Sequence, residues 1–379
     1  MNREEILQIA SHFCFEGTPT TINEETTGNI NATYLMEYQR ENEPDTHPYI
    51  MQRINTVAFP DPVSLMQNIE MVTNHIHNAL IEKGVDPTRR VLYHVKAEDG
   101  SLLYRAPDGG AWRAYHYVDD ATAHNQISSP DLFLEAGRGF GEFQTLLADF
   151  PAGSLTEIIP HFHDTPHRYE AFRAAVAADK VGRAKEITAE IAFFDQRADM
   201  MHSIVDLIKS GDLPLRVTHN DTKLNNVLLD DETGKALCVI DLDTVMPGSA
   251  LYDYGDAVRF GECTAAEDEP DLDKIGFDMS LFEAFTKGFV EKTAPPAGNL
   301  TDTEICLLPL GVQVITCELA MRFLTDYLNG DVYFKIKYPE HNLVRARAQM
   351  KLLCEVEARM DEMNAFVRRF FKKCQKSQA

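Results

Sequence analysis

The hydrophobic pattern of the chain changes near residue 119, and this change constrains the possible folds most strongly. Before it, one helical repeat covers 63–80, and short runs of β-branched and aromatic residues lie at 30–37, 49–54, 102–105 and 112–118. After it, long helical patterns occupy 131–148, 167–209, 279–292, 302–328 and 341–373. The sequence therefore predicts an α+β protein with a small β-rich domain over 1–118 and a larger α-helical domain over 119–379.

Composition narrows the range of partners. The 59 Asp and Glu residues outnumber the 36 Lys and Arg residues, which gives a formal net charge of −23. A chain this acidic repels nucleic-acid backbones and anionic bilayers, so neither is expected as its main partner. Its seven cysteines are scattered and form no C-x-x-C pair, as expected of reduced thiols. Without a signal-like or long uncharged segment, the sequence predicts a cytoplasmic protein.

Residues 216–243 hold the densest set of side chains suited to chemistry. Two apolar runs, 227–229 and 236–240, flank a turn that contains a glycine, and together they predict a β-hairpin. Asn226 enters the first strand and Asp241 follows the second, so the hairpin brings an amide oxygen close to a carboxylate. Asp221 lies on the loop that leads into this hairpin.

Oxygen ligands of this kind suit Mg²⁺, which shares its coordination with waters and substrate phosphates. Phosphoryl transfer needs a base that orients the attacking hydroxyl, together with ligands for the metal that neutralises the phosphates. The pattern H-x-D-x-x-x-x-N, followed by a hydrophobic residue and Asp, supplies these groups. The alternative is that these residues only form turns and helix caps, but their order, spacing and flanking strands favour catalysis.

The segments HNDTKLNNVLLD, IDLDTVMPG and YDYGDAVR resemble the catalytic region of the aminoglycoside phosphotransferase and choline kinase superfamily, relatives of protein kinases. Within this superfamily the chain is more similar to N-acetylhexosamine 1-kinases, for example in FPDPVSLMQNIEMV, HFHDTPHRYEAF and VYFKIKYPEHNLVR. The resemblance implies a protein-kinase-like fold of two lobes. It also implies Mg²⁺-dependent transfer of the ATP γ-phosphate to the anomeric hydroxyl of GlcNAc or GalNAc. We expect a monomer or a homodimer with small-molecule partners.

The resemblance also implies roles for individual residues. Asp221 corresponds to the catalytic base, and Asn226 and Asp241 correspond to the Mg²⁺ ligands. Asp243 is a further candidate metal ligand, with a sugar contact or a structural role as alternatives. Asp221 and Asp241 are candidate sugar contacts too, and so is His219, although we favour a bracing role for this histidine.

The nucleotide-binding residues are expected in the first domain. Segment 26–31 takes the place of the G-x-G-x-x-G loop of protein kinases but contains a single glycine. We interpret Gly28, Asn29 and Ile30 as this loop, with a plain hairpin turn as the alternative. Asn29 is also a candidate sugar contact.

The strand lysine that protein kinases use to hold the nucleotide phosphates is missing. Gln52 occupies its place next to Arg53, and only one of these neighbours can face the nucleotide. We choose Gln52, with Glu70 on the following helix as its candidate partner. Tyr117 and Val118 are expected at the hinge, where their backbone would bind adenine.

For the acceptor, the resemblance implies sugar contacts from Arg322 and Tyr333. Glu318 lies one helical turn before Arg322, so a surface ion pair is the alternative. The run GRGFG over 137–141 looks like a dinucleotide-binding loop but follows a helical pattern, which favours close helix packing. Other small alcohols (choline, homoserine or an aminoglycoside) remain alternative acceptors, and a metal-dependent hydrolase or an inactive binding module are alternative functions.

Overall fold

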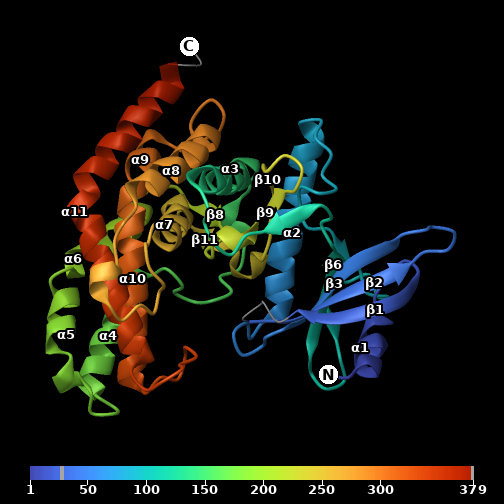
Figure 1. The fold of residues 1–379 in the computed structure, drawn as a ribbon, viewed down its shortest axis with the longest axis horizontal. Coiled ribbons are helices and arrows are strands. Elements are labelled where there is room, and N and C mark those ends of the chain that lie inside the picture. The colour runs from blue at the N-terminus through green and yellow to red at the C-terminus, as the bar shows by residue number, and fades with distance from the viewer. Residues whose placement is uncertain (26–29, 377–379) are drawn as a thin grey trace.

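Within residues 1–25 and 30–376, which the computed structural model describes, a six-stranded antiparallel sheet forms the core of the N-terminal lobe (Figure 1). Its strand order is β1-β2-β3-β6-β4, and β5 also pairs with β6. The strands are β1 (Thr18–Glu25), β2 (Ala32–Gln39), β3 (Thr46–Ile54), β4 (His94–Val95), β5 (Tyr104–Arg105) and β6 (Ala111–His116).

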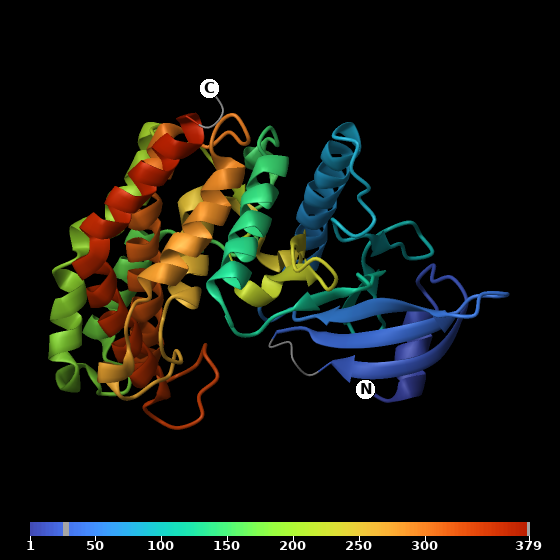
Figure 2. The ribbon, with the colours of Figure 1, turned by 45° about the horizontal axis from the view of Figure 1, so that its top comes forward.

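Two helices cover this sheet. The short helix α1 (Arg3–Ala10) packs Ile6 and Ile9 against a cluster that includes Trp112. The longer helix α2 (Pro62–Glu82) starts at Asp61, whose side chain accepts hydrogen bonds from two backbone amides of the first turn. The apolar face of α2 packs against strand residues and against side chains of the second lobe, so this helix lies at the junction of the lobes (Figure 2).

A buried asparagine ties α2 to the second lobe. The Asn68 Nδ2 atom donates to the carbonyl oxygens of Thr156 (2.8 Å) and Val245 (3.0 Å). The Thr156 amide donates in return to Asn68 Oδ1 (2.9 Å). Since Val245 follows the predicted metal-binding segment closely, α2 is fastened to the part of the chain that carries the chemistry.

Residues 117–120 connect the lobes and lead into β7 (Ala121–Ala123), which joins a sheet of the C-terminal lobe. That sheet has the order β10-β9-β7, where β9 (Val227–Asp230) and β10 (Ala236–Val239) form the predicted hairpin. Beside it, β8 (Arg216–Thr218) pairs with β11 (Met246–Gly248). The connection between the lobes is therefore hydrogen-bonded directly to the hairpin that carries the predicted metal ligands.

Helices build the rest of the C-terminal lobe (Figure 1). They are α3 (Pro130–Leu146), α4 (Thr165–Ala178), α5 (Thr188–Asp195), α6 (Ala198–Ser210), α7 (Ala250–Gly261), α8 (Met279–Thr293), α9 (Asp302–Cys306), α10 (Leu308–Asn329) and α11 (His341–Lys376). By length and hydropathy α10 could cross a membrane, but 72% of its most apolar window is buried among the other elements. It is the central helix of this lobe.

Glycines allow two close helix contacts. On α3, Gly137 faces α8 so closely that a Cβ atom would overlap the Phe285 carbonyl oxygen. This confirms helix packing as the role of the GRGFG segment. On α7, Gly255 meets Gly311 of α10 in the same way, and a side chain on either residue would overlap the backbone of the opposite helix.

The helical pattern over 167–209 is interrupted in the structure. It forms α4, α5 and α6, and α4 ends at Asp179, which has a left-handed backbone conformation. The pattern over 302–328 also divides, at Leu307, into α9 and α10. Helices α1 and α7 had no counterpart among the predicted elements.

Candidate active site

The hairpin and the loop before it bring the predicted catalytic residues together. Asp221 lies on the loop after β8, and Asn226 lies immediately before β9. The Asn226 Nδ2 atom donates to the Asp221 backbone oxygen (2.8 Å) and lies 3.3 Å from its carboxylate. This contact leaves the amide oxygen of Asn226 without a hydrogen bond in the described part of the chain, so that oxygen is available to a ligand.

The start of α7 holds the catalytic loop in place. The buried Asp253 carboxylate accepts hydrogen bonds from the backbone amides of His219 (2.9 Å) and Asn220 (2.8 Å). One turn later, Asp256 accepts from the amide of Thr222 (3.1 Å). Asn220 itself has a positive φ of 65°, a conformation that is uncommon outside glycine and that these bonds stabilise.

His219 is fully buried and braces the loop. Its Nε2 atom bonds to the Ile240 carbonyl (2.8 Å), and its Nδ1 atom accepts from the Asp221 amide (3.3 Å). The rings of Phe140 and Phe143 pack against it edge-on. With both nitrogens used and no exposed surface, His219 cannot touch a substrate, so its prediction as a sugar contact is wrong. It instead fixes Asp221 relative to the strand that precedes Asp241.

Asp241 follows β10 in a left-handed backbone conformation, with a φ of 60°. Asp241 is exposed, and its carboxylate has no hydrogen bond within the described residues. Desolvation by the surrounding protein, and then the nearby Asp243 and Asp221 carboxylates, raises the pKa of Asp241 to about 6. A carboxylate in such surroundings gains stability when a cation binds beside it.

The available oxygen atoms of Asp241 and Asn226 fit a divalent metal of the Mg²⁺ type. Among the described residues, no group of three or more His, Cys, Asp or Glu side chains forms a complete cage. A site with few protein ligands is what Mg²⁺ uses when substrate phosphates and waters complete its coordination.

Asp243 is occupied by other protein groups. It is 4% exposed, and one of its oxygens forms an ion pair with Arg113. The other oxygen accepts a hydrogen bond from Asn31 Nδ2 (2.6 Å). The structural alternative therefore holds for Asp243, and its prediction as a metal ligand is not supported.

The candidate nucleotide loop can be followed only at its end, because Gly28 and Asn29 lie outside the described residues. Ile30 is exposed, and its carbonyl accepts from Asn55 Nδ2 (3.3 Å). Asn31, which contacts Asp243, also accepts from the Asn55 amide (2.9 Å). The end of this segment thus contacts the chain directly after the metal-site residue Asp241.

Gln52 and Arg53 lie on opposite faces of β3, and Arg53 pairs with Asp108 (2.9 Å). The Gln52 carbonyl accepts from Arg113 Nε (2.9 Å) and Nη2 (2.7 Å). Glu70 is exposed on α2 and makes no contact with Gln52 in the described structure, so its prediction as the partner is wrong. The helix turns its apolar face toward the sheet and Glu70 away from it.

Tyr117 and Val118 directly follow β6, between the lobes. The Tyr117 amide donates to the Pro48 carbonyl (3.2 Å). The Val118 amide has no hydrogen bond in the described chain, so it is available to a purine. Adenine binding at this hinge stays a prediction.

The sequence interpretation missed two cations. Lys223 lies 2.6 Å from the Asp221 carboxylate, and this neighbour raises the pKa of the lysine although burial acts in the opposite direction. The sequence did contain a signal for Lys223, because it lies two positions after the predicted base Asp221. Arg113 was detectable as a charged residue in the middle of an apolar strand.

The predicted acceptor residues lie on the helical side of the site. Arg322 and Tyr333 are neighbours, with the guanidinium 5.9 Å from the ring centre, and Phe162 lies on another side of Arg322 at 5.5 Å. Glu318 does not form the alternative ion pair. It is buried and accepts from Thr165 Oγ1 (2.7 Å), and it bonds to His163 Nδ1 (2.9 Å).

A second arginine stands near Arg322. Arg168 donates to the Phe162 carbonyl from Nε (3.3 Å) and Nη2 (3.1 Å), and the Arg322 guanidinium lies 5.5 Å from the centre of the Phe162 ring, so both arginines contact the same residue. His163 packs its ring against Tyr252 of α7, 4.9 Å between centres. The residue after Tyr252 is Asp253, whose carboxylate accepts from the His219 and Asn220 amides, so this cluster is linked through α7 to the loop that carries Asp221.

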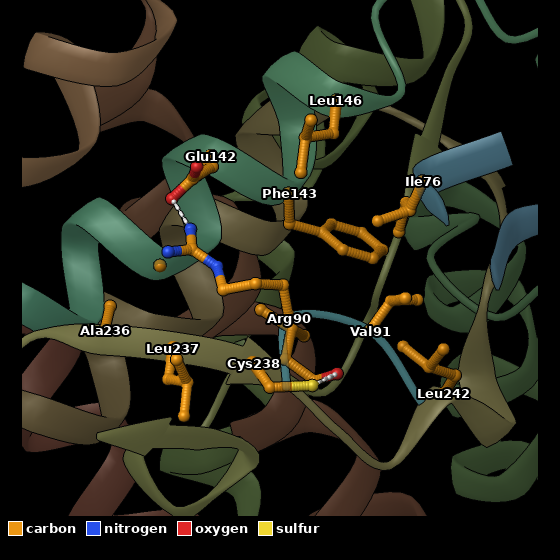
Figure 3. A pocket seen from close by; sticks show the side chains of 12 residues that line it. Ile76, Arg90, Val91, Glu142, Phe143, Leu146, Ala236, Leu237, Cys238 and Leu242 are labelled. Atoms are coloured by element: carbon orange, nitrogen blue, oxygen red, sulfur yellow. Dashed lines mark hydrogen bonds and ion pairs between the residues drawn. The ribbon is translucent and has the colours of Figure 1, made fainter. Parts of the chain in front are cut away.

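An apolar hollow backs the metal-site turn (Figure 3). It lies between α2, α3 and β10, and Leu242 points into it from the position between the two aspartates. Arg90 crosses the hollow to pair with Glu142 (2.7 Å). The anchoring of Leu242 in this wall helps to fix the direction in which Asp241 and Asp243 face.

The chain matches a known family along most of its length. A sequence profile described as "phosphotransferase enzyme family" matches residues 25–278. This stretch includes the sheet from the end of β1, the hinge, the catalytic loop and the hairpin.

Solved structures with a similar fold are kinases and phosphotransferases of small molecules. A microcompartment-associated aminopropanol kinase has a TM-score of 0.62 at 18% identity, covering 96% of this chain and 99% of that one. Choline kinase from Cryptosporidium parvum has a TM-score of 0.55 at 12% identity, covering 98% and 99%. The GDP complex of aminoglycoside 2′-phosphotransferase-IIIa has a TM-score of 0.56 at 12% identity, covering 92% and 99%. At these identities the likeness shows a shared kinase-like fold of two lobes.

Proposed function

The chain belongs to the phosphotransferase enzyme family, and from this premise we propose that it transfers the ATP γ-phosphate to the anomeric hydroxyl of an N-acetylhexosamine. The observation that carries the proposal is the juxtaposition of Asp221, Lys223 and Asn226 with the unpaired carboxylate of Asp241. These groups supply a base, a cation and metal ligands in one recess. The N-acetylhexosamine acceptor rests on the sequence resemblance and on the charge of the acceptor side.

In the proposed reaction, Asp221 orients the acceptor hydroxyl and takes its proton as the oxygen attacks. The bond between the acceptor oxygen and the γ-phosphorus forms while the bond to the β-phosphate oxygen breaks, and ADP leaves. Lys223 balances charge beside the base. Bound Mg²⁺, held by Asn226 and Asp241, would neutralise the phosphates.

The acceptor side disfavours a cationic substrate. Arg168 and Arg322 already place two guanidinium groups around Phe162, and the buried Glu318 is used by His163 and Thr165. A quaternary amine needs an aromatic cage or free carboxylates. The structurally similar aminopropanol and choline kinases are named for amino alcohols, whereas these arginines suit the hydroxyl and carbonyl oxygens of a neutral sugar.

A screen of acceptors with Mg·ATP tests this function. We expect turnover of GlcNAc and GalNAc. Glucose and galactose should be poor acceptors, because they lack the 2-acetamido group and would leave the protein group that binds it without a hydrogen-bond partner. Phosphorus NMR should show an anomeric phosphate, and the product should lose its reducing-end reactivity. A 6-phosphate product, or faster turnover of choline, ethanolamine, homoserine or an aminoglycoside, would overturn the acceptor assignment. Nucleotide hydrolysis without any acceptor would favour a hydrolase.

A further inference from the structure

One charged side chain lies in the middle of the N-terminal sheet. Arg113 is on β6, is 4% exposed, and stands between Trp112 and Ala114, which have no exposed surface. A guanidinium in this position is costly unless polar groups compensate it. Its partners therefore indicate what the charge is for.

Those partners come from both lobes. Arg113 pairs in register with Gln52 across β3 and β6, and two of its nitrogens donate to the Gln52 carbonyl. Gln52 in turn donates to Thr33 Oγ1 (3.0 Å), which fixes the amide. From the other lobe, Asp243 forms an ion pair with Arg113 Nη1.

The guanidinium lies beside the catalytic recess. Its Nη1 atom is also 4.0 Å from Met66 Sδ on α2, so it occupies the sheet face that turns toward this helix and the metal-site turn. Its ion-pair partner Asp243 lies two residues after Asp241, so the positive charge lies next to the predicted metal ligands.

Neutral Gln52 cannot balance the charge of a phosphate, whereas its register partner can. We propose that Arg113 contacts the nucleotide phosphates in the role of the missing strand lysine, and that Gln52 and Asp243 position its guanidinium. Arginine has five N–H donors, and Gln52 and Asp243 use three of them, so donors remain for phosphate oxygens. This inference rests on the proposed function, since a nucleotide substrate is what gives the charge its role.

Nucleotide titrations separate this role from a purely structural one. Calorimetry of the full chain with Mg·ADP and with adenosine compares ligands that differ in their phosphates. For Arg113→Met we expect Mg·ADP to bind about 10- to 100-fold more weakly, as for loss of a hydrogen bond to a charged group, with adenosine affinity unchanged. Equal weakening of both ligands would assign Arg113 to fold maintenance and overturn the proposal.

The decisive variant places the positive charge on β3, the strand of Gln52, and removes it from β6. In the double variant Gln52→Lys/Arg113→Met we expect Mg·ADP affinity to recover to within about threefold of the unmodified protein, because the cation returns to the same sheet face. Arg53→Met is the matched control, since Arg53 points away from the recess and pairs with Asp108. If Arg113→Met does not fold, Arg113→Lys and the double variant provide the comparison.

The outcomes distinguish this inference from the proposed function. If the unmodified protein does not bind Mg·ADP, the kinase function itself fails. If it binds Mg·ADP and the affinity is unchanged in Arg113→Met, or stays low in the double variant, the kinase function stands and the role of Arg113 is overturned.

Discussion

At the scale of single residues, the polar side chains of the candidate site fall into two groups. Some have an atom without a protein hydrogen bond that can bind a ligand, and the others do not. Asp241 has a free carboxylate, and Asn226 has a free amide oxygen. His219 and Asp243 are fully used by protein contacts. The first pair can bind a metal, and the second pair holds the backbone and the Arg113 side chain in place.

Asp221→Asn should separate chemistry from binding. The amide keeps the shape of the side chain but cannot accept the hydroxyl proton, so we expect kcat to fall by about 10²- to 10⁴-fold while Mg·ADP affinity stays close to normal. Steady-state kinetics and calorimetry on one preparation measure both quantities. Asp231→Asn, at the exposed hairpin turn, is the control. Near-normal turnover of Asp221→Asn would exclude it as the base.

Glu262 gives a pH dependence of stability. It is fully buried, neither carboxyl oxygen has a hydrogen bond in the described structure, and burial raises its pKa well above the usual range. The folded state therefore holds a proton that the unfolded chain releases above about pH 4.3, so stability falls as pH rises.

The glutamine of Glu262→Gln does not titrate, so this pH-dependent contribution to stability is absent from the variant. We expect the variant to be more stable than the unmodified protein at pH 8, with a difference that shrinks as the pH falls toward 5. Urea unfolding across this range measures it, with the exposed Glu41→Gln as the control. Parallel stability curves for Glu262→Gln and the unmodified protein would contradict the assignment.

Residue spacing predicted the group of Asp221, Asn226 and Asp241 because a hairpin fixes which residues meet. The same spacing could not show that His219 and Asp243 are used by other protein groups, since their partners come from distant segments. Asn31 and Arg113, which bind Asp243, lie in the other lobe. Bonds between distant segments are decided by tertiary packing, which local patterns do not encode.

At the scale of elements, the catalytic loop depends on a helix crossing. α7 carries Asp253 and Asp256, and it crosses α10 where Gly255 meets Gly311. The approach is so close that no side chain fits. Any shift of α7 at this point also moves the carboxylates that hold the catalytic loop.

Gly255→Ala should therefore lower both stability and activity. The added methyl group would overlap the Gly311 carbonyl, and overpacking of this kind costs about 1–3 kcal/mol. We expect a lower unfolding midpoint and a kcat that falls more than the folded fraction does. Gly153→Ala is the control, because nothing lies within 4 Å of a Cβ atom there. Unchanged kcat in the folded variant would show that the loop is independent of the crossing.

Periodicity predicted the long helices with one apolar face, such as α2 and α3, to within a few residues. It failed for α7, because nearly every residue of ALYDYGDAVRFG is buried and no stripe distinguishes its faces. It also joined α9 to α10, since the break at Leu307 leaves the apolar pattern intact.

At the scale of the whole molecule, ligand binding should couple to stability, because the recess is built from both lobes. Mg·ADP at 100 times its dissociation constant should stabilise the protein by about 2.7 kcal/mol, seen as a higher thermal midpoint. In Asp241→Ala, Mg²⁺ loses a carboxylate ligand, so we expect no Mg-dependent shift. Asp230→Ala, at the far end of β9, serves as a control. A full shift in Asp241→Ala would show that this residue is not a metal ligand.

The arrangement of the lobes was less accessible from sequence than the lobes themselves. The change of pattern near residue 119 separates a sheet from a set of helices, but Asn68 in α2 bonds to the second lobe over a separation that no local pattern reveals. The predicted acceptor residues are likewise brought together only by tertiary packing. Arg168 comes from α4 and Arg322 from α10, and only the folded chain shows that both contact Phe162.

The pairing of β7 with β9 restricts how the cleft can open. A connection that ran free through solvent would let one lobe swing with no effect on the other. Here the segment after the hinge is hydrogen-bonded to the strand that begins next to Asn226. The Asp120 carbonyl also accepts a hydrogen bond from the Asp231 amide (2.9 Å), so an opening motion through this connection would pivot before Asp120, where residues 117–119 belong to no strand. Product release can then widen the entrance while the spacing between Asn226 and Asp241 stays constant from one turnover to the next.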